Sequence, residues 1–240
     1  MATDKLILSI HDSYHSAFSQ PVVYISLFAS LVFLLTLFFT TKYYGIVKTT
    51  RQQCYIMTVP VSSTMTLASA YFLYGFFTQN GTWQDKIQYV LYERWWTVAL
   101  TVLFTTYLVT DLVLGAIFYP DKMDILTAWI HHILYSIALI WVIKMKYTQL
   151  FIFACIMEAP SFMLALGSLN KDWRSDRIFA ALFISTRLVF HGWLEWYFAL
   201  YHPNKEVWKI MVTALPVHLF WFYKFILQQI RLAKLKVKAA

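Results

Sequence analysis

Apolar residues occur in long stretches along this chain, separated by short polar connections. A helix needs roughly 20 mainly apolar residues to cross the hydrocarbon core of a bilayer. The stretch from Pro21 to Thr41 meets this requirement and carries no charged residue. The pattern predicts about seven membrane-spanning helices, at residues 21–41, 57–78, 96–119, 127–143, 148–168, 178–201 and 207–229. We therefore expect an all-α integral membrane protein.

The amino-acid composition excludes most other classes of protein. The 240 residues are 60% hydrophobic and 13% charged, whereas a soluble domain is about 45–50% apolar and 25% charged. A soluble domain of this length could not bury so much apolar surface. The chain has 6 Gly and 6 Pro, which excludes disordered and collagen-like chains. Its 2 cysteines exclude a disulfide-built secreted scaffold.

Lysine and arginine residues predict the orientation, because cytosolic loops of membrane proteins are enriched in them. The larger set falls on one side of the predicted helices: Lys42, Lys48, Arg51, Lys122, Lys171, Arg174, Arg177, Lys224, Arg231, Lys234, Lys236 and Lys238. The smaller set falls on the other side: Lys5, Lys86, Arg94, Lys144, Lys146, Lys205 and Lys209. We therefore expect a lumenal N-terminus and a cytosolic C-terminus. The formal charge of +8 then suits anionic lipid headgroups, and no nucleic-acid partner is expected.

Two short motifs agree with a location in the endoplasmic reticulum membrane. Asn80 begins an acceptor triplet for N-glycosylation, Asn80-Gly81-Thr82, in a loop expected to be lumenal; an ordinary turn is the alternative. Lys236 and Lys238, close to the C-terminus, resemble a dilysine retrieval signal that coat proteins recognise. The alternative for these lysines is a basic tail held near anionic lipid.

Several ionisable residues fall inside the predicted spans, where a charge costs on the order of 3 kcal/mol. They are Asp111, His131, His132, Glu158, Arg187, His191, Glu195 and His218. Counted at about 1.5 Å per residue, those of five helices lie in the cytosolic half of the membrane or near its midplane. Such residues usually face a bundle interior or a water-filled cavity. We infer one polar chamber that opens toward the cytosol.

Local spacing refines this hypothesis. Adjacent His131 and His132 point about 100° apart on a helix, so one of them is expected to point inward. Asp111, at a similar depth on the preceding helix, is expected to accept a hydrogen bond from that ring and fix its tautomer. Glu158 and Arg187 have opposite charges and are expected to neutralise each other.

One face of the sixth predicted span carries three ionisable residues. Arg187, His191 and Glu195 follow one another at intervals of four residues, which places them on the same side of a helix. His218 of the last span is expected at a similar depth. A structural alternative applies to each of these groups, because buried His, Asp and Glu also join helices through hydrogen bonds.

A metal site is a second interpretation of the polar chamber. His131, His132 and Glu158 would supply three ligands of the types that zinc prefers. Adjacent histidines on one helix cannot easily chelate one ion, however, unlike the i, i+4 pair of a zincin helix. We therefore expect no metal and no bound cofactor.

The residues also show a family resemblance. The chain resembles the TLC-domain membrane proteins over residues 50–230, in which an Asp, a paired His and a Glu followed by Ser or Pro recur in this order on successive helices. The matching segments are Tyr107-Leu108-Val109-Thr110-Asp111-Leu112, Tyr119-Pro120-Asp121-Lys122, His131-His132 and Glu158-Ala159-Pro160-Ser161. Ile184-Ser185-Thr186-Arg187-Leu188 resembles the segment with the family's later Arg, and Arg94, before Trp95-Trp96, resembles a further one.

The resemblance implies an architecture and a site. The family fold is a ring of six helices around a central, lipid-sized cavity, with an additional N-terminal helix. Applied to this chain, the family fold predicts a lumenal segment at 1–20, a transmembrane anchor at 21–41, the six-helix domain at 50–230 and a basic cytosolic tail at 231–240. In ceramide synthases, which belong to this family, the paired histidines catalyse amide formation from a fatty acyl thioester and a sphingoid base.

The chain departs from the ceramide synthases on one helix. Those enzymes carry a His-Asp pair after the paired histidines and a further Asp on the next helix. Here that helix reads Phe151-Ile152-Phe153-Ala154-Cys155-Ile156-Met157-Glu158 and lacks these acids. The chain is more similar to the short TLC-domain-containing proteins.

Two functions are therefore predicted as alternatives. The first is acyl transfer onto a lipid amine or hydroxyl, with acyl-CoA as co-substrate. The expected catalytic residues are His131, His132 and Asp111, and the expected substrate-binding residues are Glu158, Arg187, His191 and His218. The second is non-catalytic lipid binding, sensing or trafficking in the endoplasmic reticulum membrane. Membrane lipids or fatty acyl chains are the expected partners in both, and the sequence leaves a monomer or a homodimer open.

Overall fold

A computed structural model describes residues 16–239 of the chain, which contain helices and no strand. The helices form two compact units, Met1–Ser175 and Asp176–Ala240. Most of the predicted lumenal segment at 1–20, including Lys5, lies outside the described residues, as do the side chains of Lys236 and Lys238.

The first unit contains the helices up to the fifth apolar stretch. They are α2 (Pro21–Tyr43), α3 (Thr50–Tyr55), α4 (Thr58–Thr78), α5 (Trp83–Leu91), α6 (Trp95–Phe118), η1 (Pro120–Lys122), η2 (Ile125–Ile130), α7 (His131–Lys144), α8 (Thr148–Ala154), η3 (Cys155–Glu158), α9 (Ala159–Leu169) and η4 (Lys171–Trp173). The second unit contains α10 (Asp176–Leu182), η5 (Phe183–Phe190), α11 (His191–Tyr201), α12 (Glu206–Val212) and α13 (Leu215–Ala239).

Every predicted span is helical in the structure. Within the described residues, 6 helical stretches are long and apolar enough to cross a membrane: Pro21–Tyr43, Thr50–Thr78, Trp95–Phe118, Thr148–Leu169, Asp176–Tyr201 and Glu206–Leu235. The fourth predicted span corresponds to the shorter apolar helix Ala128–Lys144. The expected class, an all-α multi-pass membrane protein, is confirmed. The predicted ring of six helices would combine both units and stays a prediction.

The connection after the second span contains a helix that the apolar pattern did not predict. α5 has only nine residues, and the Thr82 hydroxyl at its start accepts a hydrogen bond from the Asp85 backbone while the Asp85 carboxylate bonds back to Thr82. This reciprocal cap stabilises the first turn of a helix. Ile87 and Val90 are buried, so α5 packs against the bundle through one narrow apolar face.

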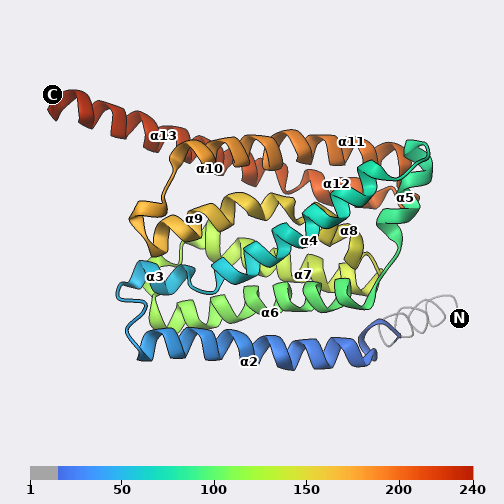
Figure 1. Ribbon diagram of the computed structural model, residues 1–240, viewed down its shortest axis with the longest axis horizontal. Helices are drawn as coiled ribbons and strands as arrows, with labels where there is room; N and C mark the ends of the chain where they lie inside the picture. The colour runs from blue at the N-terminus through green and yellow to red at the C-terminus, as the bar shows by residue number, and fades with distance from the viewer. Residues whose placement is uncertain (1–15, 240) are drawn as a thin grey trace, which may run out of the picture. The chain divides into compact units, whose positions relative to one another are not determined.

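The N-terminal helix α2 packs against α6 at both of its ends. α2 runs beside α6 in the first unit (Figure 1). At one end, Val23 joins Val98 and Val102 of α6 in a buried apolar cluster. At the other end, Phe38 of α2 contacts Phe118 of α6, with ring centroids 5.4 Å apart. The predicted anchor is thus part of the packed unit.

Several candidate residues lie where the regular α-helix is interrupted. His131 and His132 directly follow the π-helix η2, Glu158 ends the 3-10 segment η3, and Arg187 lies within the π-helix η5. Pro160 explains one interruption, because a proline lacks the N–H group that would continue the hydrogen-bond ladder. π-helical turns are frequent at functional sites, so these interruptions separate the candidate residues from ordinary core positions.

A hydroxyl from α4 supports the interrupted helix. The buried Ser69 side chain donates a hydrogen bond of 2.7 Å to the backbone oxygen of Phe153, directly before η3. We predict that Ser69→Ala lowers the stability of the protein by about 1–3 kcal/mol, because it leaves a buried carbonyl with a lost partner. Thermal unfolding in detergent measures the change.

Ser63→Ala is the matched control, because the Ser63 hydroxyl bonds only within its own helix, to Pro60. Equal melting temperatures for Ser69→Ala and Ser63→Ala would contradict the role assigned to Ser69.

Candidate functional site

The first candidate site joins α6 and α7 through a carboxylate and an imidazole. Asp111 is buried with 8% of its surface exposed, and its Oδ2 lies 3.6 Å from Nδ1 of His132. This nitrogen is buried and has no hydrogen-bond partner. The distance exceeds a formed hydrogen bond, but catalytic hydrogen bonds are often long in the absence of substrate. We name Asp111, His132, Tyr107 and Tyr119 the His132 cluster.

The other oxygen of Asp111 is held by a tyrosine. Tyr119 donates a hydrogen bond of 2.8 Å from its hydroxyl to Oδ1 of Asp111. Tyr119 follows the last residue of α6 and precedes Pro120, so the helix cannot continue and the side chain folds back along it. Gly115 makes room for this return, since a Cβ there would lie 3.0 Å from the Tyr119 ring and would collide with Sδ of Met123.

The two adjacent histidines have different surroundings. His132 faces Asp111 and lies 6.2 Å from the ring of Tyr107. His131 instead packs against Tyr135, one turn later on α7, with ring centroids 5.2 Å apart. The Tyr107 hydroxyl shares a hydrogen bond of 3.0 Å with Thr58 of α4, which fixes the ring beside His132. The structure thus pairs His132, and not His131, with Asp111.

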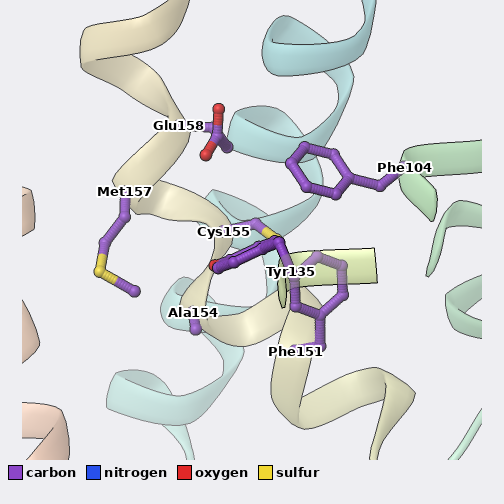
Figure 2. Close-up of a pocket in the computed structure, with 7 residues that line it drawn as sticks. All are labelled: Phe104, Tyr135, Phe151, Ala154, Cys155, Met157 and Glu158. Carbon is purple, nitrogen blue, oxygen red and sulfur yellow. The ribbon is translucent and has the colours of Figure 1, made fainter. Parts of the chain in front are cut away.

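Glu158 lines a small pocket next to the His132 cluster. The pocket is formed by aromatic, aliphatic and sulfur-containing side chains and one carboxylate: Phe104, Tyr135, Phe151, Ala154, Cys155, Met157 and Glu158 (Figure 2). Its empty space is about 220 Å³, open mouth included, which is less than the 300–1,000 Å³ of typical ligand sites. A lipid chain would therefore have to displace side chains to enter. We name it the Glu158 pocket.

Two aromatic residues of the pocket lead toward the His132 cluster. Tyr135 lines the pocket and contacts His131. Phe104 lines it as well and packs against Tyr107, with ring centroids 5.8 Å apart. On the far side, the Ser62 hydroxyl of α4 donates a hydrogen bond of 3.2 Å to Glu158. The carboxylate is thus anchored while the wall between pocket and cluster is aromatic.

The second unit holds a separate chain of ionisable groups. Nδ1 of His191 and Nδ1 of His218 are 3.0 Å apart, so one ring donates a hydrogen bond and the other accepts it. Nε2 of His191 lies 3.3 Å from Oε1 of Glu195. If the carboxylate accepts from His191, then His191 accepts from His218 and the tautomers of both rings are coupled. We name these three residues the His191 chain.

Arg187 lies one helical turn before the His191 chain. Its side chain is buried and its guanidinium carbon lies 5.1 Å from the ring centroid of Trp221 and 5.5 Å from that of Phe183. Arg is well suited to such aromatic surroundings, because its charge is delocalised and weakly hydrated. Arg187 lies in the π-helix η5 and His191 begins α11, so their shared face, predicted from α-helical spacing, stays a prediction.

The residues of the predicted single chamber belong to two units of the chain, so that chamber stays a prediction. Asp111 and His132 come together in the first unit, with Glu158 in the neighbouring pocket, whereas Arg187 and the His191 chain belong to the second. Pairing of Glu158 with Arg187 would join the two units and stays a prediction. Among residues 16–239, no group of three His, Cys, Asp or Glu side chains is arranged to hold a metal ion.

Sequence reasoning missed a second polar network, at the start of α6 and α8. The Arg94 guanidinium donates to Gln149, and the Gln149 amide donates to the backbone oxygen of Tyr89. Beside them, Thr148 shares a hydrogen bond of 2.9 Å with Thr97. We name these residues, with Glu93, the Arg94 network. The family resemblance indicated Arg94 alone. Its partner Gln149 and the neighbouring Thr148 are far from Arg94 in the sequence, so the sequence did not link them.

The predicted glycosylation triplet and the C-terminal lysines have different structural settings. Asn80 is exposed after the end of α4, while the Thr82 hydroxyl of the same triplet donates to Asp85 at 2.7 Å and caps α5. Glycosylation of Asn80 stays a prediction. The tail that carries Lys236 and Lys238 continues α13 as helix to Ala239.

Comparison of the chain with known protein families, with characterised proteins and with solved structures found no match.

The Arg94 network predicts a pH dependence of stability. Burial raises the pKa of Glu93 above its usual value, although a hydrogen bond of 3.0 Å from Thr148 opposes this. The folded state then binds the proton more tightly than the unfolded state, so Glu93 favours folding at low pH and this contribution is lost as pH rises through the folded pKa. We predict that the melting temperature of Glu93→Gln falls less than that of the wild type between about pH 4 and pH 7.

Thermal unfolding in detergent at several pH values measures this difference. Asp85→Asn is the control of opposite sign: hydrogen bonds with Thr82 lower the pKa of Asp85, so this variant is expected to change the pH dependence in the opposite direction. Parallel curves for the wild type and Glu93→Gln would contradict the prediction.

Proposed function

We propose that the protein is an enzyme of membrane lipid metabolism that transfers a fatty acyl group onto a lipid amine or hydroxyl. The observation that carries this proposal is the 3.6 Å approach of His132 Nδ1, in the apolar helix Ala128–Lys144, to Asp111 Oδ2, in a helix long and apolar enough to cross a membrane. Ionisable groups at such positions are costly and usually functional. The resemblance to the TLC-domain family, in which paired histidines catalyse acyl transfer, supports the same reaction.

The proposed reaction needs one general base. His132, with Nδ1 turned toward Asp111, takes the proton of the attacking amine or hydroxyl at Nε2 while the new C–N or C–O bond forms. The C–S bond of the acyl thioester then breaks, and the proton passes from His132 to the departing thiolate. Asp111 orients the ring and stabilises its protonated form, and Tyr119 holds Asp111 in place.

Other residues are proposed to bind substrate. The Glu158 pocket, with its mostly apolar lining, suits part of an acyl chain once its side chains move. Arg187, with His191 and His218 nearby in the second unit, suits an anionic or polar headgroup, or the phosphates of acyl-CoA as co-substrate. His131 would shape the aromatic wall through Tyr135.

Substitution of the two histidines separates their roles. We predict that His132→Gln lowers the rate of acyl transfer by about 10²–10⁴-fold, the usual contribution of a general base. His131→Gln, which leaves the contact between Asp111 and His132 intact, is the matched control and is expected to retain most of the activity. Purified protein with a long-chain acyl thioester and lipid acceptors provides the assay, and lipid analysis of cells that express each variant provides the readout in the membrane.

The alternative function is lipid binding without chemistry. It is favoured by the 3.6 Å distance between His132 Nδ1 and Asp111 Oδ2, which is longer than a formed hydrogen bond. On this alternative, lipid stays bound through purification, and His132→Gln restores a normal lipid composition in cells. That result would contradict the enzymatic proposal.

We further propose a location in the endoplasmic reticulum, with the N-terminus in the lumen. The proposal rests on the distribution of Lys and Arg and on the tail with Lys236 and Lys238. A C-terminal epitope tag is predicted to react with antibody when only the plasma membrane is permeabilised, because the tail is cytosolic on this orientation. An N-terminal tag should react only after the internal membranes are opened, and the reverse pattern would contradict the orientation.

A further inference from the structure

We propose that the N-terminal helix is part of the candidate site, and that Phe38 of α2 is a positioning residue that holds Tyr119 against Asp111. This inference deepens the proposed function and rests on it, because its importance comes from the role assigned to His132. The sequence suggested only a membrane anchor for this helix.

A continuous line of contacts runs from α2 to the imidazole. The Phe38 ring is fully buried, and its centroid lies 6.3 Å from that of Tyr119. Tyr119, itself 2% exposed, donates to Oδ1 of Asp111 at 2.8 Å. Oδ2 of the same carboxylate lies 3.6 Å from Nδ1 of His132. Each step joins neighbouring groups, and the first step is the only one supplied by α2.

Tyr119 lies where the regular helix ends: its backbone N–H still donates to Gly115 at 3.0 Å, but the helix does not continue beyond it. Its backbone (φ −145°, ψ 50°) has left the α-helix, and the 3-10 turn η1 follows at once. Two surfaces lie against the ring. One is the bare backbone of Gly115, which the ring approaches closely, and the other is Phe38. A smaller side chain at position 38 would leave a cavity beside Tyr119, and buried side chains relax into such space only in part.

Movement of Tyr119 away from Asp111 changes the hydrogen bonding of the Asp111 carboxylate. Without the Tyr119 hydroxyl, Oδ1 of Asp111 loses its neutral donor, and the buried carboxylate must turn to other donors or remain unsatisfied. The His132 ring is the partner already facing Asp111. The reactivity of His132 therefore reports the position of Tyr119, whether or not a substrate is present.

The neighbouring phenylalanine provides a matched control. Phe39 is 46% exposed and contacts Phe118, with ring centroids 5.8 Å apart. Phe38→Leu and Phe39→Leu thus remove the same ring from the same helix. Only the first substitution removes a contact with Tyr119 that links α2 to the carboxylate of Asp111.

The experiment measures how fast His132 reacts with diethyl pyrocarbonate in the purified full-length protein, with His131 as an internal reference in the same peptide map. We expect Phe38→Leu and Tyr119→Phe each to change the His132 rate by about threefold or more, within the range of coupling between contacting residues. Phe39→Leu should leave the rate unchanged. In the Tyr119→Phe background, Phe38→Leu should have no further effect, because the hydroxyl through which Phe38 acts is already absent.

Two results would overturn the proposal: equal rates for Phe38→Leu and Phe39→Leu, or additive effects of Phe38→Leu and Tyr119→Phe. Phe38→Tyr keeps the ring and is expected to show the wild-type His132 rate. This variant replaces Phe38→Leu as the informative one if Phe38→Leu does not fold. A changed His132 rate in Phe38→Tyr, with an unchanged melting temperature, would count against the proposal. Acyl transfer is measured on the same samples. The wild-type protein could show no acyl transfer while the effects of Phe38→Leu and Tyr119→Phe on the His132 rate are coupled. That result would refute the proposed function and leave the positioning role of Phe38 intact.

Discussion

A buried carboxylate on α6 determines how the first unit must be arranged around its site. Asp111 is almost fully buried, and a carboxylate taken from water has to find donors in the protein. The hydroxyl of Tyr119 is one donor, and the ring of His132 is the group that faces the other oxygen. The turn after α6, the start of α7 and the packing of α2 all follow from keeping these two side chains near one carboxylate.

Interruptions of the regular α-helices coincide with several of the candidate residues. A regular α-helix satisfies its own backbone groups, so polar side chains on it only need each other. At η3, by contrast, Pro160 disturbs the hydrogen-bond ladder, and two hydroxyls of α4 bond to this segment: Ser69 donates to the backbone oxygen of Phe153, and Ser62 donates to the Glu158 carboxylate. One helix thus supports the interrupted backbone and the carboxylate at the pocket through two different side chains.

The sequence was sufficient for the long apolar helices, because the bilayer imposes their length and composition. It also brought Asp111 and the paired histidines together as candidates. It could not decide between His131 and His132, since helical spacing gives the angle between two side chains but not the rotation of the helix. It gave no role to Tyr119, whose return toward Asp111 depends on a chain reversal and on the missing side chain of Gly115. Contacts between segments that are distant in the sequence could not be predicted either, as the bond between Arg94 and Gln149 illustrates.

The central claim is that Asp111 faces one particular nitrogen of His132. Nitrogen NMR of protein labelled with ¹⁵N-histidine reports which ring nitrogen carries the proton in the neutral imidazole, with His132→Gln used to assign the signal. The arrangement described here predicts a proton on Nδ1, directed at Oδ2 of Asp111, and a change of this signal in Asp111→Asn. A proton on Nε2 of His132 that is insensitive to Asp111→Asn would contradict the account.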